Sequence, residues 1–280
     1  FYEDENVSFS ISSLGFGFQN YSIKKYKDPE GKQVQFYNDA PLFSLQYDGK
    51  NIPFNISVSD DKLTYTGEAN INGKILKRVL TYNVEKQAFS SEILIPEGFD
   101  QISLQISQDK YIPKNNNFFL PSFQYQDFVY HTGEGKTKSD RITNIKEGEG
   151  LIRNIDNVNM ASIGSQYFVT SVVNKSDINP KLLNKVEGHK THVILTYDFK
   201  NTKISEVKEL YYLGVKKTEI LQKVDSLLPE VLNYGMFGFI SKVLLKLLKM
   251  IQEVVGNWGV AIIFLTIIVR TALLPFNIIS

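Results

Sequence analysis

Hydrophobic and polar residues alternate along residues 1–205 with the spacing of β-strands that bury one face. Valine, phenylalanine and isoleucine alternate with serine at 7–12, and a second alternating run lies at 102–107. Similar runs recur at 166–173 and 191–199, and Asn72-Gly73 is typical of a tight hairpin because both residues tolerate positive φ. Many short strands with intervening turns predict a mainly β fold, a β-sandwich over residues 1–205.

The apolar period changes to that of a helix towards the C-terminus. Ile220, Leu221 and Val224 fall at helical spacing ahead of Pro229, so we expect a helical closing segment over 206–235.

The following segment, 236–254, combines a narrow polar stripe with a wide apolar surface. Lys242, Lys246, Lys249 and Glu253 are spaced four, three and four residues apart, which places them on one side of a helix. Nearly all other residues of the segment are large and apolar. We favour an amphipathic helix on a membrane surface, with its lysines among the lipid headgroups. An ordinary helix buried in a protein core is the alternative.

Residues 258–279 contain a single charged residue, Arg270. Because a membrane-crossing helix needs about 20 residues, the segment 255–280 is long enough to cross only if it includes Arg270. Trp258 lies where an interfacial aromatic residue is expected, and Arg270 follows about 18 Å further along the helix. An arginine at that depth is costly unless it faces water or protein, so it indicates a functional cavity. The alternative is a shorter helix ending near Pro275, from which Arg270 extends to the interface.

Composition limits the classes of partner and chemistry. Lys plus Arg total 31 against 30 for Asp plus Glu, and this net charge of +1 argues against a nucleic-acid binder. Residues 236–280 carry +3, which leaves −2 for residues 1–235. The chain has no cysteine, which excludes disulfides and thiolate sites. The chain begins at Phe1 and ends in an apolar run, and we expect it to be a fragment of a longer protein.

No pattern of catalytic residues stands out. His131, His189 and His192 show no metal-ligand spacing with carboxylates, and we find no phosphate loop, nucleophile elbow or zinc motif. We therefore assign no catalytic residue, no metal and no cofactor.

The C-terminal residues resemble bacterial YidC membrane protein insertases. The matching stretches are Asn233-Tyr234-Gly235, Phe239-Ile240-Ser241, Leu247-Leu248-Lys249, Val255-Gly256-Asn257-Trp258-Gly259, Thr266-Ile267-Ile268-Val269-Arg270 and Leu274-Pro275, with Tyr211-Tyr212-Leu213-Gly214 further upstream. Their order and spacing are similar to those of the family's surface helix and first core transmembrane helix. The resemblance covers about fifty residues, with the arginine in register.

The resemblance implies an architecture and a location. Residues 1–205 would form a periplasmic β-supersandwich similar in fold to galactose mutarotase, closed by 206–235. Residues 236–254 would lie on the membrane surface, and 255–280 would be the truncated first core helix of a multi-pass protein in the bacterial inner membrane. Residues 1–254 would face the periplasm, although the lysine-rich flank would favour the cytoplasm by charge alone.

The resemblance also implies a function. The family helps newly made proteins insert and fold, alone or with the Sec translocon and its accessory subunits, and other parts of the protein meet the ribosome. Arg270 would supply the charge of a hydrophilic substrate groove, and Thr266 lies on the same helix face. A hydroxyl bonded to its own helix backbone is an equally good explanation of Thr266. No ATP and no enzyme activity are implied.

Two other functions stay open at this point. The mutarotase-like fold allows a membrane-anchored carbohydrate-binding protein or an epimerase that uses His and Glu. The β-domain could also serve mainly as a docking or chaperoning module, which an exposed apolar cleft or sheet edge would support.

Overall fold

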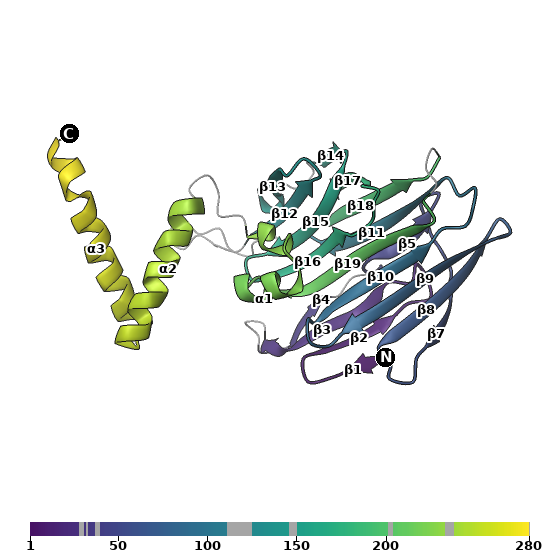
Figure 1. Cartoon of the computed structure of the whole chain (residues 1–280), viewed down its shortest axis with the longest axis horizontal. Helices are drawn as coiled ribbons and strands as arrows, with labels where there is room; N and C mark the ends of the chain where they lie inside the picture. The colour runs from purple at the N-terminus through teal and green to yellow at the C-terminus, as the bar shows by residue number, and fades with distance from the viewer. Residues whose placement is uncertain are drawn as a thin grey trace. The chain divides into compact units, whose positions relative to one another are not determined.

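The computed structural model describes residues 1–27, 31, 33–36, 40–110, 125–145, 150–200, 204–232 and 238–279, without the side chains of 144, 238, 239, 241, 242, 272, 273 and 275–279. The chain divides into two compact units, Phe1–Val231 and Leu232–Ser280. Figure 1 shows the strands of the first unit and the helices α2 and α3 of the second.

Three antiparallel sheets build the first unit. The largest has nine strands in the order β13 (Thr137–Arg141), β12 (Gln126–Thr132), β15 (Val158–Ser165), β16 (Phe168–Asn174), β19 (Glu206–Val215), β10 (Ala88–Leu94), β9 (Lys74–Asn83), β8 (Thr64–Ile71) and β7 (Asn55–Val58). A six-stranded sheet has the order β14 (Leu151–Ile155), β17 (Lys181–Glu187), β18 (Lys190–Asp198), β11 (Gln101–Asp109), β5 (Ser44–Tyr47) and β6 (Lys50–Asn51). A four-stranded sheet holds β1 (Tyr2–Glu3), β2 (Val7–Ile11), β3 (Phe18–Lys27) and β4 (Gln33–Phe36).

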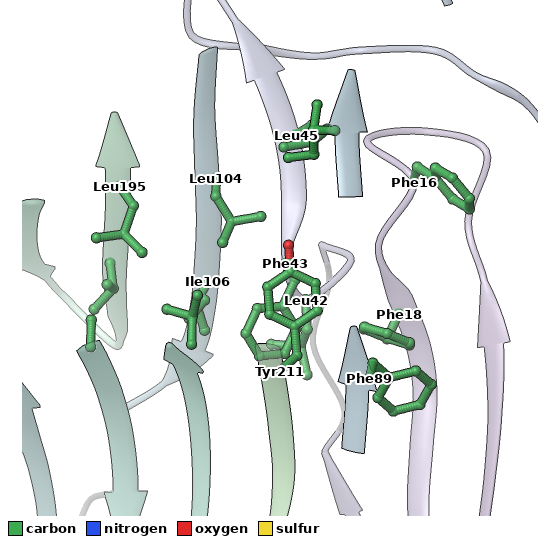
Figure 2. Close-up of a cluster of buried hydrophobic side chains, with 14 of the residues drawn as sticks. Phe16, Phe18, Leu42, Phe43, Leu45, Phe89, Leu104, Ile106, Leu195 and Tyr211 are labelled. Carbon is green, nitrogen blue, oxygen red and sulfur yellow. The ribbon is translucent and has the colours of Figure 1, made fainter. Parts of the chain in front are cut away.

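The main core lies where the three sheets face one another. Phe18 and Phe89 pack with ring centroids 4.4 Å apart, and Phe43 stacks on Tyr211 at 4.2 Å. Figure 2 shows these rings together with Leu104, Ile106 and Leu195, which come from β11 and β18 of the six-stranded sheet. Aromatic residues fill the thick space between sheets because each buries a large apolar area.

The alternating runs of the sequence form strands as predicted. Residues 7–11 form β2, residues 102–107 lie within β11, and 166–173 and 191–199 correspond to β16 and β18 within one or two residues at each end. Asn72 and Gly73 have φ of 53° and 79° and close the β8–β9 hairpin. The mainly β fold is therefore confirmed.

The helical interpretation of 206–235 is wrong for its first part. Residues 206–215 form β19, which pairs with both β10 and β16 near the middle of the nine-stranded sheet. Its inner residues Val207 and Tyr211 are buried, yet Leu210 and Tyr212 are also partly or fully covered. A strand covered on both faces loses the clear alternation by which sequence patterns identify strands.

A smaller core covers the outer face of the nine-stranded sheet. Helix α1 (Thr218–Val224) and the 3-10 helix η2 (Leu228–Val231) bury Leu221, Val224, Leu228 and Val231 there. η2 contacts β12 and β16, whose outward residues Val129 and Val173 are buried. These side chains do not belong to the main aromatic cluster. The closing segment is therefore held by a separate layer of apolar contacts.

The second unit is a pair of contacting helices, α2 (Gly238–Val255) and α3 (Trp258–Ile279). Gly256, with φ of 69°, ends α2. The Asn257 side chain then caps α3 by accepting hydrogen bonds from the backbone N–H groups of Gly259 at 2.8 Å and Val260 at 3.2 Å. Ala261 is fully buried, since its small side chain lets the two helices approach closely.

Candidate functional site

Thr266 and Arg270 lie four residues apart on one exposed face of α3. The Thr266 hydroxyl donates to the carbonyl oxygen of Ile262 at 2.8 Å, so its proton is used by its own helix. Thr271 makes the same kind of bond to Ile267, also at 2.8 Å, on a different side of the helix. Thr266 can therefore offer only lone pairs to a ligand on the Arg270 face, and the role of both residues in a groove stays a prediction.

Trp258 and the lysines expected at the membrane interface lie on different helices of the second unit. Trp258 is the first residue of α3 and is 52% exposed. Lys246 and Lys249 are exposed on α2, whereas the side chain of Lys242 lies outside the described residues. The structure thus leaves three of the four predicted interface residues accessible, and their contact with lipid stays a prediction.

Large apolar side chains are exposed along both helices. On α2 these are Ile240, Val243, Leu245, Met250 and Val254, and on α3 Val260, Ile262, Ile263, Phe264, Ile267, Ile268 and Leu274. Exposed apolar surface of this extent usually marks contact with protein or membrane. Among the residues that the structure describes, no helix is both long enough and apolar enough for a membrane span. The crossing expected for 255–280 is therefore not confirmed.

The β-domain contains a buried charge that sequence patterns did not identify. Arg78 is fully buried, and its guanidinium donates to the carbonyl oxygens of Phe16 and Phe43 at 2.9 Å each and to the Tyr211 hydroxyl at 2.6 Å. Tyr211 in turn donates to the carboxylate of Glu209, which also accepts a bond from the Tyr197 hydroxyl at 2.7 Å. Burial raises the pKa of Glu209. This network joins the nine-stranded sheet to Tyr197 of the six-stranded sheet and to the turns at Phe16 and Phe43, and it serves the fold.

His131 and His192 have neutral hydrogen-bond partners. His131 Nδ1 lies 2.6 Å from Asn159 Oδ1, and His192 Nδ1 lies 2.7 Å from the Ser107 hydroxyl and 3.2 Å from the Gln105 amide. Burial lowers the pKa of His192. Neither ring is hydrogen-bonded to a carboxylate in the described part of the chain, so the paired acid and base of an epimerase are not assembled there. The described residues also bring together no group of three or more potential metal ligands.

The chain combines a β-sandwich domain with a lysine-bearing helix and an apolar helix. These features define a class of protein in which a β-domain is followed by helices that expose apolar side chains. Residues 79–247, more than half of the chain, match the family model of the YidC periplasmic domain. The chain belongs to the YidC family.

Individual relatives agree with this assignment. The membrane protein insertase YidC of Campylobacter jejuni is 27% identical over 262 residues, covering 91% of this chain and 45% of the relative. That of Geotalea daltonii is 25% identical over 303 residues, covering 95% and 54%. The chain thus spans about half the length of these curated relatives.

A solved structure shares the fold of the β-domain. The α-N-acetylgalactosaminidase NagBb of Bifidobacterium bifidum superposes with a TM-score of 0.51 at 8% identity, over 76% of this chain and 35% of that chain. At this identity the similarity concerns the fold alone.

Proposed function

We propose that this chain is the external domain and the first membrane-associated helices of an insertase that helps new proteins insert and fold in the bacterial inner membrane. The observation that carries the proposal is the family match together with the exposed apolar surface of α2 and α3. Apolar surface of this kind is stable in lipid or against further helices. Residues 1–254 would lie on the periplasmic side.

Within this proposal Arg270 and Thr266 line a hydrophilic groove that further helices of the intact protein complete. A guanidinium that water reaches from one side attracts polar or acidic stretches of an incoming chain partway into the bilayer. The apolar part of that chain then partitions sideways into lipid. The partners of the insertase would be nascent membrane proteins, the bilayer, the Sec translocon with its accessory subunits, and the ribosome.

The groove is tested in the intact protein by following insertion of a substrate with a charged translocated tail, in cells depleted of their own insertase. We expect Arg270→Glu to impair protease protection of the tail strongly and Arg270→Lys to impair it mildly, because lysine keeps the charge. Normal insertion with Arg270→Glu would refute the groove.

Thr266 has a matched control in the same helix. Thr266→Val and Thr271→Val each remove a hydroxyl that donates to the carbonyl four residues earlier at 2.8 Å. Only Thr266 shares the face of Arg270, since Thr271 is turned by about 100° from Arg270. We expect an insertion defect from Thr266→Val alone. Equal defects would assign both hydroxyls to the helix and not to substrate.

A further inference from the structure

One end of the β-domain gathers cations and tyrosines that contact one another. Its members, which we call the cation–tyrosine surface, are Tyr26, Tyr125, Arg141, Tyr167, Lys216 and Lys217. The Arg141 guanidinium carbon lies 4.3 Å from the Tyr125 ring centroid, and Lys216 Nζ lies 6.0 Å from the same centroid. Lys217 Nζ lies 6.0 Å from the ring centroid of Tyr26. Cations at these distances from a ring face are attracted by its electrons.

The contact of Lys217 with Tyr26 and the contacts of Arg141 and Lys216 with Tyr125 form two groups, and Phe168 belongs to the first. Its ring lies 5.9 Å from that of Tyr26. The neighbouring Tyr167 accepts a hydrogen bond from the backbone N–H of Lys216 through its carbonyl oxygen at 2.8 Å. The Tyr167 side chain is 63% exposed, and Lys217 is also exposed.

Strand register explains why Lys216 lies flat across the sheet. Asp127 is opposite Arg141 on one side and opposite Gly164 on the other. A Cβ atom at Gly164 would lie 2.7 Å from Lys216 Cε and 2.8 Å from Nζ, closer than side chains approach. Because Gly164 has no side chain, Lys216 can extend over it towards Asp127 after β19 ends at Val215.

The surface has more positive than negative charge. Asp127 pairs with Arg141 at 3.2 Å. Among the described residues it is the one carboxylate in these contacts, against the three cations Arg141, Lys216 and Lys217. Burial raises the pKa of Asp127 and lowers that of Lys216 to about 8. Both shifts mean that the charges are incompletely solvated. Three cations against one carboxylate leave these contacts with a net positive charge that would attract an anion.

We propose that the cation–tyrosine surface binds the headgroup phosphates of anionic lipids, with Lys217 and Arg141 facing phosphate and Tyr167 among the headgroups. Tyrosine beside lysine or arginine is the composition of the membrane–water interface, and clustered cations are attracted to anionic leaflets. The proposal rests on the proposed membrane location and adds a lipid contact made by the β-domain itself.

The absence of cysteine from the chain provides a direct test. A single Tyr167→Cys, labelled with an environment-sensitive fluorophore, reports on this surface in the whole chain. Ile152→Cys is the control, because Ile152 is similarly exposed at 59% but lies on β14 at the edge of the six-stranded sheet. With phosphatidylcholine vesicles that contain phosphatidylglycerol, we expect a blue shift at position 167 that high salt reverses. We expect no shift at position 152, and none at 167 with phosphatidylcholine alone.

A charge variant tests whether Lys217 is needed for the fluorescence shift. Lys217→Gln in the Tyr167→Cys chain should remove most of the shift, whereas Lys181→Gln, at an exposed lysine of β17, should not. Lys217 is exposed, so the variant leaves the fold intact. The proposal is overturned by equal shifts at 167 and 152, by a shift that persists in neutral vesicles, or by a full shift with a soluble oligonucleotide.

Co-flotation separates this proposal from the proposed function. A chain that floats with the vesicles but shows no shift at position 167 would overturn the lipid surface and leave the membrane location standing. A chain that does not float would overturn both.

Discussion

The hydroxyl of Tyr211 joins Arg78 to Glu209 in the centre of the β-domain. It accepts a hydrogen bond from Arg78 Nη2 at 2.6 Å and donates its own proton to the Glu209 carboxylate. A fully buried guanidinium and a nearly buried carboxylate are thus connected without direct contact. A hydroxyl can fill this position because it accepts one hydrogen bond and donates another, whereas arginine can only donate.

Arg78→Met should destabilise the chain by about 3–5 kcal/mol, as expected when one member of a buried polar network is removed. The change leaves the carbonyl oxygens of Phe16 and Phe43 without their donor. Urea unfolding of the chain in mild detergent, followed by the near-ultraviolet circular dichroism of its tyrosines, measures the loss. Arg153→Met is the control, because Arg153 is half exposed and pairs with Asp140 at the surface. Equal losses in the two variants would contradict a special role for Arg78.

The raised pKa of Glu209 predicts that this residue's contribution to folding stability changes with pH in the direction opposite to that of most carboxylates. Burial raises its pKa above the ordinary 4.5 in the folded chain, so folding favours the protonated form. The stability it contributes is present below pH 4.5 and is lost as pH rises through the folded-state pKa. The stability of the unmodified chain minus that of Glu209→Gln should therefore fall as pH rises above 4.5. A rise would mean that Arg78 and the tyrosines favour the charged carboxylate.

Sequence patterns predicted strands with one solvated face and also β16, which is buried along most of its length, but they missed β19. β2 and β11 alternate because their outer residues meet water. β19 is buried without interruption from Tyr211 to Val215, so this half of the strand shows no alternation of apolar and polar residues. The order of the strands in each sheet also depends on contacts distant in sequence, which local patterns cannot report.

The candidate site was predictable only in part for a similar reason. Spacing alone places Thr266 and Arg270 on one helix face, and the structure agrees with that placement. No local signal identifies Arg78 or Lys216, because each acquires its partners from strands far away in the chain. An isolated arginine in an alternating strand is usually solvent-facing, and Arg78 departs from that rule.

The lowered pKa of Lys216 predicts that the free energy of unfolding increases as pH rises from about 8. Burial beside Arg141 lowers its pKa from 10.5 to about 8, with Asp127 only partly opposing the shift. Between these values the unfolded chain binds more protons than the folded one, so stability increases by up to about 1.4 kcal/mol per pH unit. Urea unfolding at pH 7.5, 8.5 and 9.5, roughly spanning this window, measures the slope.

Lys216→Met should abolish that increase, because methionine does not titrate. Lys217→Met is the control, since Lys217 is exposed and should leave the slope unchanged. The series stops below pH 10 because the buried tyrosines, whose pKa burial raises, begin to oppose the effect once the unfolded chain loses its tyrosine protons. An identical slope in both variants would show that other groups cause it.

The separate layer of α1 and η2 predicts that this region can open without the main core. Leu221 is fully buried there and lies outside the main aromatic cluster, so Leu221→Ala should cost about 2–4 kcal/mol locally. Hydrogen exchange should then accelerate in α1 and η2 while the amides of β11 and β18 keep their protection. Ile220→Ala, at a half-buried position of the same helix, should have a smaller effect. Uniform acceleration across both large sheets would instead show that the closing layer and the main core unfold together.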